Sequence, residues 1–226
     1  MKKNILSINN LSVSFDYQEN FLSKKQKIKA VNNINLKIKK GSFFGLVGES
    51  GSGKTTLGRA ILGANKISSG NVIYHDDNKD YNLADITKKE MKEYRKKAQL
   101  IFQDPYAALS PRMTVRDIIA EPLEVMGITS SRDETDQRVR DIASKCRLNL
   151  EHLRRFPHAF SGGQRQRISI ARALVSQPNF IVADESVAAL DVSIQADILN
   201  LLKQLQNEYK LTYLFISHDL KAVSYT

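Results

Sequence analysis

The chain has 226 residues, of which 42% are apolar and 26% are charged, and its formal net charge at pH 7 is +10. This length suffices for the hydrophobic core of one large or two small domains, and the composition excludes both wholesale disorder and a bundle of membrane spans. The single cysteine, Cys146, excludes an internal disulfide framework and a cysteine-rich metal site, and it is typical of a reducing compartment.

The positive charge is concentrated near the N-terminus. Residues 1–60 carry eight more basic than acidic residues, residues 61–100 carry two more, and residues 101–226 carry equal numbers. A charge of +10 suggests nucleic acid or an anionic membrane surface as a partner, but this uneven distribution favours a solvated lysine-rich face. Residues 4–10 lack the apolar core of a signal peptide, and no run approaches the roughly 20 apolar residues of a membrane span, so a cytoplasmic location is expected.

The first predicted elements are strands. Ile34, Leu36 and Ile38 alternate with polar residues, which is the pattern of a half-buried strand. Four short apolar runs follow and predict buried parallel strands, at residues 43–47, 100–102, 180–183 and 211–216. Residues 192–209 repeat apolar side chains at three- and four-residue steps, as an amphipathic helix does. This alternation predicts an α/β fold.

The middle of the chain has a different pattern. Between Pro105 and Pro157 no strand is predicted, whereas Val139, Ile142 and Cys146 mark one face of a helix. We therefore predict a mostly helical segment inserted into the α/β core.

A phosphate-binding loop is predicted directly after the apolar run 43–47. The pattern G-x-x-x-x-G-K-[ST] is met by Gly48, Glu49, Ser50, Gly51, Ser52, Gly53, Lys54 and Thr55. Small residues let backbone N–H groups surround phosphate oxygens, and a helix that starts near Gly53 directs its positive end toward them. Lys54 is expected to reach the β- and γ-phosphates, and the Thr55 hydroxyl is expected to coordinate Mg²⁺.

A pair of acidic residues ends the predicted strand 180–183. Asp184 is placed to hold Mg²⁺ and Glu185 to polarise a water molecule as a general base. Taken alone, two carboxylates at a strand end are equally consistent with a turn, and the phosphate loop favours the functional interpretation. Asp191 is a second possible base, but it is less well placed.

A second anion site is suggested at the start of another predicted helix. Ser161, Gly162, Gly163 and Gln164 precede a helical apolar face, and a capping serine with two glycines exposes backbone N–H groups. On its own, the same string is an ordinary loop with an N-cap.

In this order, the motifs resemble those of the nucleotide-binding subunit of ATP-binding-cassette (ABC) transporters, over nearly the whole chain. The residues that carry the resemblance are GESGSGKT (48–55), Gln103, SGGQ (161–164), IVADE (181–185) followed by Asp191, and His218. Further strings, including FQDPYA (102–107) and ALDVSIQ (189–195), look like the oligopeptide, dipeptide and nickel importer group.

The resemblance implies a P-loop NTPase fold, with a RecA-like core, an N-terminal antiparallel β subdomain and an inserted α-helical subdomain. Residues 1–103 and 159–226 would form the core, and residues 104–158 the helical subdomain. It further implies a peripheral ATPase at the cytoplasmic face of the membrane that powers import of peptides or a related small solute. Its expected partners are a homologous ATPase subunit, two transmembrane permeases and an extracytoplasmic solute-binding protein, with no nucleic acid.

The resemblance also implies the residue roles. Two subunits would sandwich two ATP molecules, so that phosphates held by Lys54 and its loop, with Thr56 beside it, meet SGGQ of the other subunit. Glu185 would act as base, His218 would contact the γ-phosphate, and Gln103 would contact Mg²⁺ or the attacking water. Asp191 would lie at the dimer seam. Phe15 is expected to stack on adenine, with Tyr17 as the competing residue, and residues 104–127 are expected to receive the permease.

Two departures from the family pattern stand out. Relatives usually have DEPVSALD where this chain has DESVAALD, so that Ser186 replaces proline and Ala188 replaces serine. Both acids remain, and we expect hydrolysis to persist. Relatives also continue beyond the position that matches Thr226, so the chain is expected to be either a fragment of a longer cassette or a natural short form. The alternative function is a soluble ABC ATPase that acts on nucleic acid or ribosomes, although one cassette without long heptads argues against it.

Overall fold

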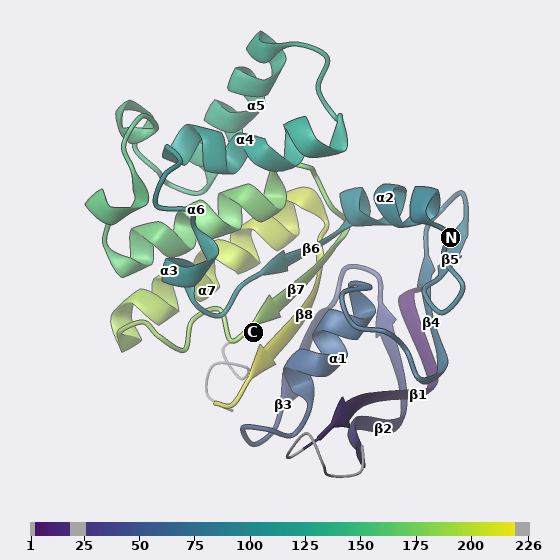
Figure 1. Ribbon diagram of the computed structural model, residues 1–226. Helices are drawn as coiled ribbons and strands as arrows, with labels where there is room; N and C mark the ends of the chain where they lie inside the picture. The colour runs from purple at the N-terminus through teal and green to yellow at the C-terminus, as the bar shows by residue number, and fades with distance from the viewer. Residues whose placement is uncertain (1–2, 19–25, 220–226) are drawn as a thin grey trace.

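The computed structural model describes residues 3–18 and 26–219, and these form two four-stranded sheets with helices around them (Figure 1). The elements in chain order are β1 (Asn4–Tyr17), β2 (Gln26–Lys39), β3 (Phe43–Val47), α1 (Lys54–Ile61), β4 (Ser69–His75), β5 (Asp80–Asn82), α2 (Lys88–Lys97), β6 (Ala98–Ile101), α3 (Pro105–Ala108), α4 (Val115–Met126), α5 (Arg132–Lys145), two 3₁₀ turns at Leu150–His152 and Pro157–Ala159, α6 (Gly162–Leu174), β7 (Phe180–Asp184), α7 (Val192–Tyr209) and β8 (Thr212–Ser217). The α/β prediction is confirmed.

The first sheet is antiparallel and has the strand order β2-β1-β4-β5. Its two longest strands, β1 and β2, bury one face and leave the lysines of β2 exposed, including Lys27, Lys29, Lys37 and Lys39. Because every second residue of a strand points to the same side, this sheet explains much of the N-terminal charge excess as a solvated surface.

The second sheet is parallel and has the strand order β3-β8-β7-β6. The prediction of buried strands is confirmed for β7 and β8, and it is wrong for β3, whose residues are only half-buried. The reason is position: β3 is at one end of the strand order, with a neighbouring strand on one side only among the described residues. The run predicted at 100–102 also shifts, since β6 ends at Ile101 and Phe102 is 39% exposed.

The parallel sheet separates two hydrophobic clusters. Phe180 and Val182 of β7 face α1 and the antiparallel sheet, whereas Ile181 and Ala183 face the helices α4 to α7. The predicted helix 192–209 matches α7, and Cys146, at the end of α5, is fully buried as expected for a core residue. Helices α4, α5, α6 and α7 share one continuous cluster with this sheet face, which we call the helical cluster.

The helices begin where the sequence supplies caps. Thr87, Thr114, Ser131 and Ser161 each accept a hydrogen bond from a backbone N–H of the first turn, and Thr87 and Ser161 form complete capping boxes. In the part of the chain that the structure describes, no helix combines the length and apolar character needed to cross a bilayer.

Candidate functional site

The candidate site lies where the parallel strands end. The carboxyl ends of β3, β6, β7 and β8 lead respectively into the phosphate loop, Gln103, Glu185 and His218. Strands that run in one direction end at one edge of their sheet, and such an edge is the usual ligand site of open α/β folds. A cavity of about 310 Å³ at this edge is lined by Ala30, Ser50, Gly51, Gly53, Lys54, Thr55, Thr56, Gln103 and Glu185.

The phosphate loop is held in shape by its lysine and its glycines. Lys54 is largely buried, and its Nζ donates to the carbonyl oxygens of Gly48 at 2.7 Å and Glu49 at 2.6 Å. Gly53 precedes α1 with a φ of 92°, and a Cβ there would lie 2.1 Å from the carbonyl oxygen of Ala30 on β2. Only glycine fits this position. The N-terminus of α1 is thus directed into the cavity, as an anion site requires.

The acidic residues after β7 are joined to this loop. The Thr55 hydroxyl donates to Asp184 Oδ1 at 3.1 Å, which ties α1 to β7. Burial raises the pKa of Asp184 above its ordinary value, against the opposing effect of the Thr55 hydrogen bond, and the neighbouring Glu185 charge raises it further. A buried carboxylate beside a hydroxyl presents the hard oxygen ligands that Mg²⁺ prefers.

Glu185 sits at the centre of a group from three strand ends. Gln103 Nε2 donates to Glu185 Oε2 at 2.7 Å, and His218 Nδ1 lies 3.6 Å from the same oxygen. The backbone of Glu185 is left-handed, with a φ of 44°, and its N–H donates to Ile216 of β8 at 2.9 Å. A non-glycine residue held in this conformation is strained, and such strain often marks a functional position.

The SGGQ string lies elsewhere in the same chain. Ser161 caps α6, and neither it nor Gly162, Gly163 or Gln164 lines the cavity at the phosphate loop. Gly163 instead packs against α7, where a Cβ would lie 2.7 Å from Ile194 Cγ2. The exposed Asp191 begins α7 without a side-chain cap, and it too is outside the cavity.

The two adenine-stacking candidates are both exposed on β1, Phe15 by 45% and Tyr17 by 49%. They are two residues apart and therefore on the same face of the strand. Phe15 pairs with Ile28 of β2, which is two residues from the cavity-lining Ala30. Ala30 also lines the cavity and was not predicted from the sequence. The only signal for it is the glycine at position 53, which leaves room for the Ala30 carbonyl oxygen next to the loop.

Comparison with known proteins decides the family. The family model described as ABC transporter matches residues 31–188. The chain belongs to the ABC transporter family. The resemblance read from the five motifs is therefore confirmed, and the P-loop NTPase fold with it.

The relatives of this ABC cassette include proteins named for peptide transport. It is 48% identical over 224 residues to the oligopeptide transport ATP-binding protein OppF of Streptococcus mutans, a match that covers 99% of this chain and 70% of that protein. It is 50% identical over 225 residues to the dipeptide transport ATP-binding protein DppF of Lactococcus lactis subsp. cremoris, covering 99% and 69%.

Solved structures of ABC cassettes have the same fold. The ATP-binding cassette MJ0796, solved as a dimer in a post-hydrolysis state bound to ADP and Pi, matches with a TM-score of 0.82 and 31% identity, over 97% of this chain and 90% of that one. CbiO1 of Clostridium perfringens, part of the transporter complex cbiONQ, matches with a TM-score of 0.80 and 28% identity, over 99% and 82%.

Proposed function

We propose that this ABC cassette is the ATP-hydrolysing subunit of an importer for dipeptides or oligopeptides. The observation that carries the catalytic part is a pair of side-chain hydrogen bonds beside the phosphate loop. One joins Gln103 to Glu185, and the other joins Thr55 to Asp184. The peptide part is supported by the names of relatives that are 48–50% identical over 99% of the chain.

Each residue of the site has a role in this proposal. Lys54 and the backbone N–H groups of residues 48–55 bind the phosphates of ATP, since five of these residues line the cavity at the start of α1, namely Ser50, Gly51, Gly53, Lys54 and Thr55. Glu185 accepts a proton from the attacking water, while Gln103 and His218 keep its carboxylate in place and Gln103 orients the water. Phe15 stacks on adenine, and Tyr17 is the competing residue.

The donor set at the end of β7 fits magnesium. Thr55, Asp184 and Gln103 all offer oxygen atoms, and two of these side chains are already bonded to each other at 3.1 Å. When bound there, Mg²⁺ would neutralise charge on the phosphate oxygens. The residues of this chain would hold it through the Thr55 hydroxyl and the Asp184 carboxylate.

A second copy or a homologous subunit completes the site in this proposal. The SGGQ residues cap α6 but do not line their own phosphate cavity, so they are available to the nucleotide of a partner subunit. Asp191 would lie at the seam between the two. The dimeric state of the related cassette MJ0796 supports this arrangement.

The permeases would bind on the helical segment, which would hold the ATPase at the cytoplasmic face of the membrane. A groove of about 250 Å³ between α4, α6 and β6 is lined by Phe102, Pro122, Val125 and Met126 among others. Val125 is 71% exposed and Phe102 39%, so the groove presents neighbouring apolar side chains at the surface, as protein interaction sites do. A solute-binding protein would deliver the peptide to the permeases.

The catalytic proposal is tested with Glu185→Gln in the complete transporter. We expect ATP turnover to fall by at least about 100-fold, because glutamine cannot act as the general base. ATP binding should persist, because glutamine has the same size as glutamate and can still form hydrogen bonds. Glu93→Gln makes the same change in an exposed ion pair on α2 and should leave turnover unaltered. Unchanged turnover in Glu185→Gln would show that another group is the base.

The solute is tested separately by uptake. Cells without their own peptide importers would receive this chain with its permeases and binding protein, and uptake of a labelled dipeptide, a labelled tetrapeptide and labelled maltose would be measured. Peptide uptake that Glu185→Gln abolishes supports the proposal. ATP-dependent uptake of maltose, with none of the peptides, would refute the peptide assignment and leave the ATPase assignment standing.

A further inference from the structure

A second cavity lies outside the ATP site, among helices α4 and α5 and the turn at Leu150–His152. Its volume is about 580 Å³, which falls within the range of about 300–1,000 Å³ typical of small-molecule sites. Four arginines line it: Arg116 from α4, Arg132 and Arg140 from α5, and Arg154 from the segment after the turn. We call it the arginine cavity.

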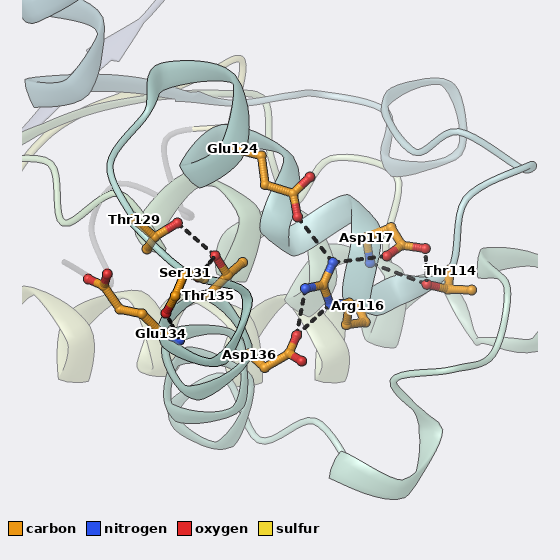
Figure 2. A network of polar contacts seen from close by, with 9 residues as sticks. All are labelled: Thr114, Arg116, Asp117, Glu124, Thr129, Ser131, Glu134, Thr135 and Asp136. Carbon is orange, nitrogen blue, oxygen red and sulfur yellow. Dashed lines mark hydrogen bonds and ion pairs between the residues drawn. The ribbon is translucent and has the colours of Figure 1, made fainter.

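Arg116 forms ion pairs with three carboxylates, and two of them, Asp117 and Asp136, line this cavity (Figure 2). Its guanidinium contacts Asp136 at 2.6 Å, and Asp117 and Glu124 at 3.2 Å each. Asp117 also accepts from the Thr114 hydroxyl at 2.6 Å, and this bond, with the Arg116 contacts, holds the pKa of Asp117 below its ordinary value. The network joins the start of α4 to α5 and fixes that wall of the cavity.

The same network leaves the other arginines without carboxylates. Asp136 is four residues after Arg132 and four before Arg140 on α5, so it would be the usual helical ion-pair partner of either. It is engaged by Arg116 instead. Among residues 3–18 and 26–219, no carboxylate lies within ion-pair distance of Arg132, Arg140 or Arg154. Three arginines that form no ion pair within the described residues therefore line this cavity, and Glu151 is the carboxylate of its lining that Arg116 does not engage.

The rest of the lining is apolar. Val139 and Leu153 are buried, and Leu150 is 37% exposed. Guanidinium groups bind phosphate oxygens in pairs of parallel hydrogen bonds. Their planar faces can also stack on a flat ring of a ligand, and the Leu150 side chain can contact its apolar part. A concave site of this size suits a small molecule better than an extended protein segment, which needs a longer surface.

We propose that the arginine cavity binds a phosphorylated small molecule, of the size of a nucleotide, at a site distinct from the phosphate loop. Arg140 and Arg154 contact its phosphate groups from opposite elements, and Leu150 contacts its organic part. Arg116 of α4 serves indirectly, by keeping Asp136 away from Arg132 and Arg140 of α5.

The proposal is tested by fluorescence titration with N-methylanthraniloyl-ADP. Lys54→Ala in the full chain weakens binding at the phosphate loop, and the part of the remaining binding that depends on Arg140 and Arg154 reports the arginine cavity. In this background Arg140→Gln with Arg154→Gln should weaken binding about 100-fold, about tenfold for each lost charge-assisted contact. Arg138→Gln is the matched control, because Arg138 lies on the same helix but pairs with Glu134 outside the cavity, and it should leave affinity unchanged.

Two further measurements protect the test from a folding artefact. Glu151→Gln removes the facing carboxylate and should tighten binding several-fold, an increase that a loss of structure would not produce. Inorganic tripolyphosphate should displace the fluorescent nucleotide from the unmodified cavity, and Arg140→Gln should weaken this displacement.

Three results would overturn the proposal. The first is equal affinity in Arg138→Gln and in the double variant, and the second is no binding of the probe to Lys54→Ala at millimolar concentration. The third is binding of a polyglutamate peptide in its place, which would assign the surface to an acidic protein partner. None of these results bears on the ATP site, because Gln103 and Glu185 lie outside this lining.

Discussion

Substituting Gly53 by alanine tests how the phosphate loop is built. Gly53 has a φ of 92°, a conformation that costs an L-residue about 1–2 kcal/mol. Its added Cβ would also lie 2.1 Å from the Ala30 carbonyl oxygen, so either β2 or the loop must move, at a further cost of about 1–3 kcal/mol. We expect Gly53→Ala to lower the free energy of unfolding by about 2–5 kcal/mol, or to displace the loop and abolish ATP binding.

Two other glycines of the chain are matched controls for this change. Gly51 has a φ of 79° and Gly41 a φ of 77°, and a Cβ at either would meet no atom of the described part of the chain within 4 Å. Alanine at these positions therefore adds the conformational cost alone, about 1–2 kcal/mol. Gly51 lies in the loop and Gly41 in the turn between β2 and β3, so the pair also separates local strain from any effect on the site.

The assay is urea-induced unfolding of each variant, with nucleotide affinity measured in parallel by fluorescence. Gly53→Ala should lose at least about 1 kcal/mol more than Gly51→Ala, or lose nucleotide binding that Gly51→Ala retains. If Gly53→Ala and Gly51→Ala had the same effect on both quantities, the close approach of β2 to the loop would not matter and the reasoning would be refuted.

Three other substitutions give outcomes of known sign. Asp184→Asn should raise the melting temperature at pH 7–8, because folding raises the pKa of the Asp184 carboxyl and so disfavours its ionised form. The gain should vanish below the carboxyl's unfolded pKa of about 4, where the carboxyl is protonated in both the folded and the unfolded state. Melting curves recorded over a series of pH values would test this. Tyr94→Phe should cost about 1 kcal/mol in urea unfolding, since the buried Tyr94 hydroxyl donates to the Ile61 carbonyl at 2.7 Å, and an unchanged midpoint would contradict it. Ser186→Ala should be neutral or stabilising in the same assay, because the buried Ser186 hydroxyl has no hydrogen-bond partner among residues 3–18 and 26–219, and a large loss of stability would contradict this.

The sequence was most informative where local chemistry decides structure. The strand 43–47, the helix from residue 192 to residue 209 and the cap at Ser161 follow from periodicity and capping, and all three are present. The phosphate loop was equally predictable, because its glycines and lysine are adjacent in the chain.

Features that depend on distant segments were not predictable from residues alone. The half-buried state of β3 follows from its place in the strand order, which apolar composition does not encode. The left-handed backbone of Glu185 accompanies a hydrogen bond from its N–H to Ile216 on the neighbouring strand β8, and no local signal in the sequence marks it. Likewise, the Gln103–Glu185 bond joins positions 82 residues apart, and only resemblance to a family suggested that they meet.

The helical cluster limits how this ATPase can move. Side chains of α4 to α7 and one face of the parallel sheet belong to one continuous buried cluster. A hinge that opened 200 Å² of this apolar surface would cost about 5 kcal/mol at about 25 cal/mol per Å², which is comparable to the whole stability of many domains. Displacements of the helices during the ATPase cycle should therefore be small shear movements in which side chains slide but stay in contact. A permease seated on α4 would accordingly sense a shift of the helix along the sheet, with no opening between them.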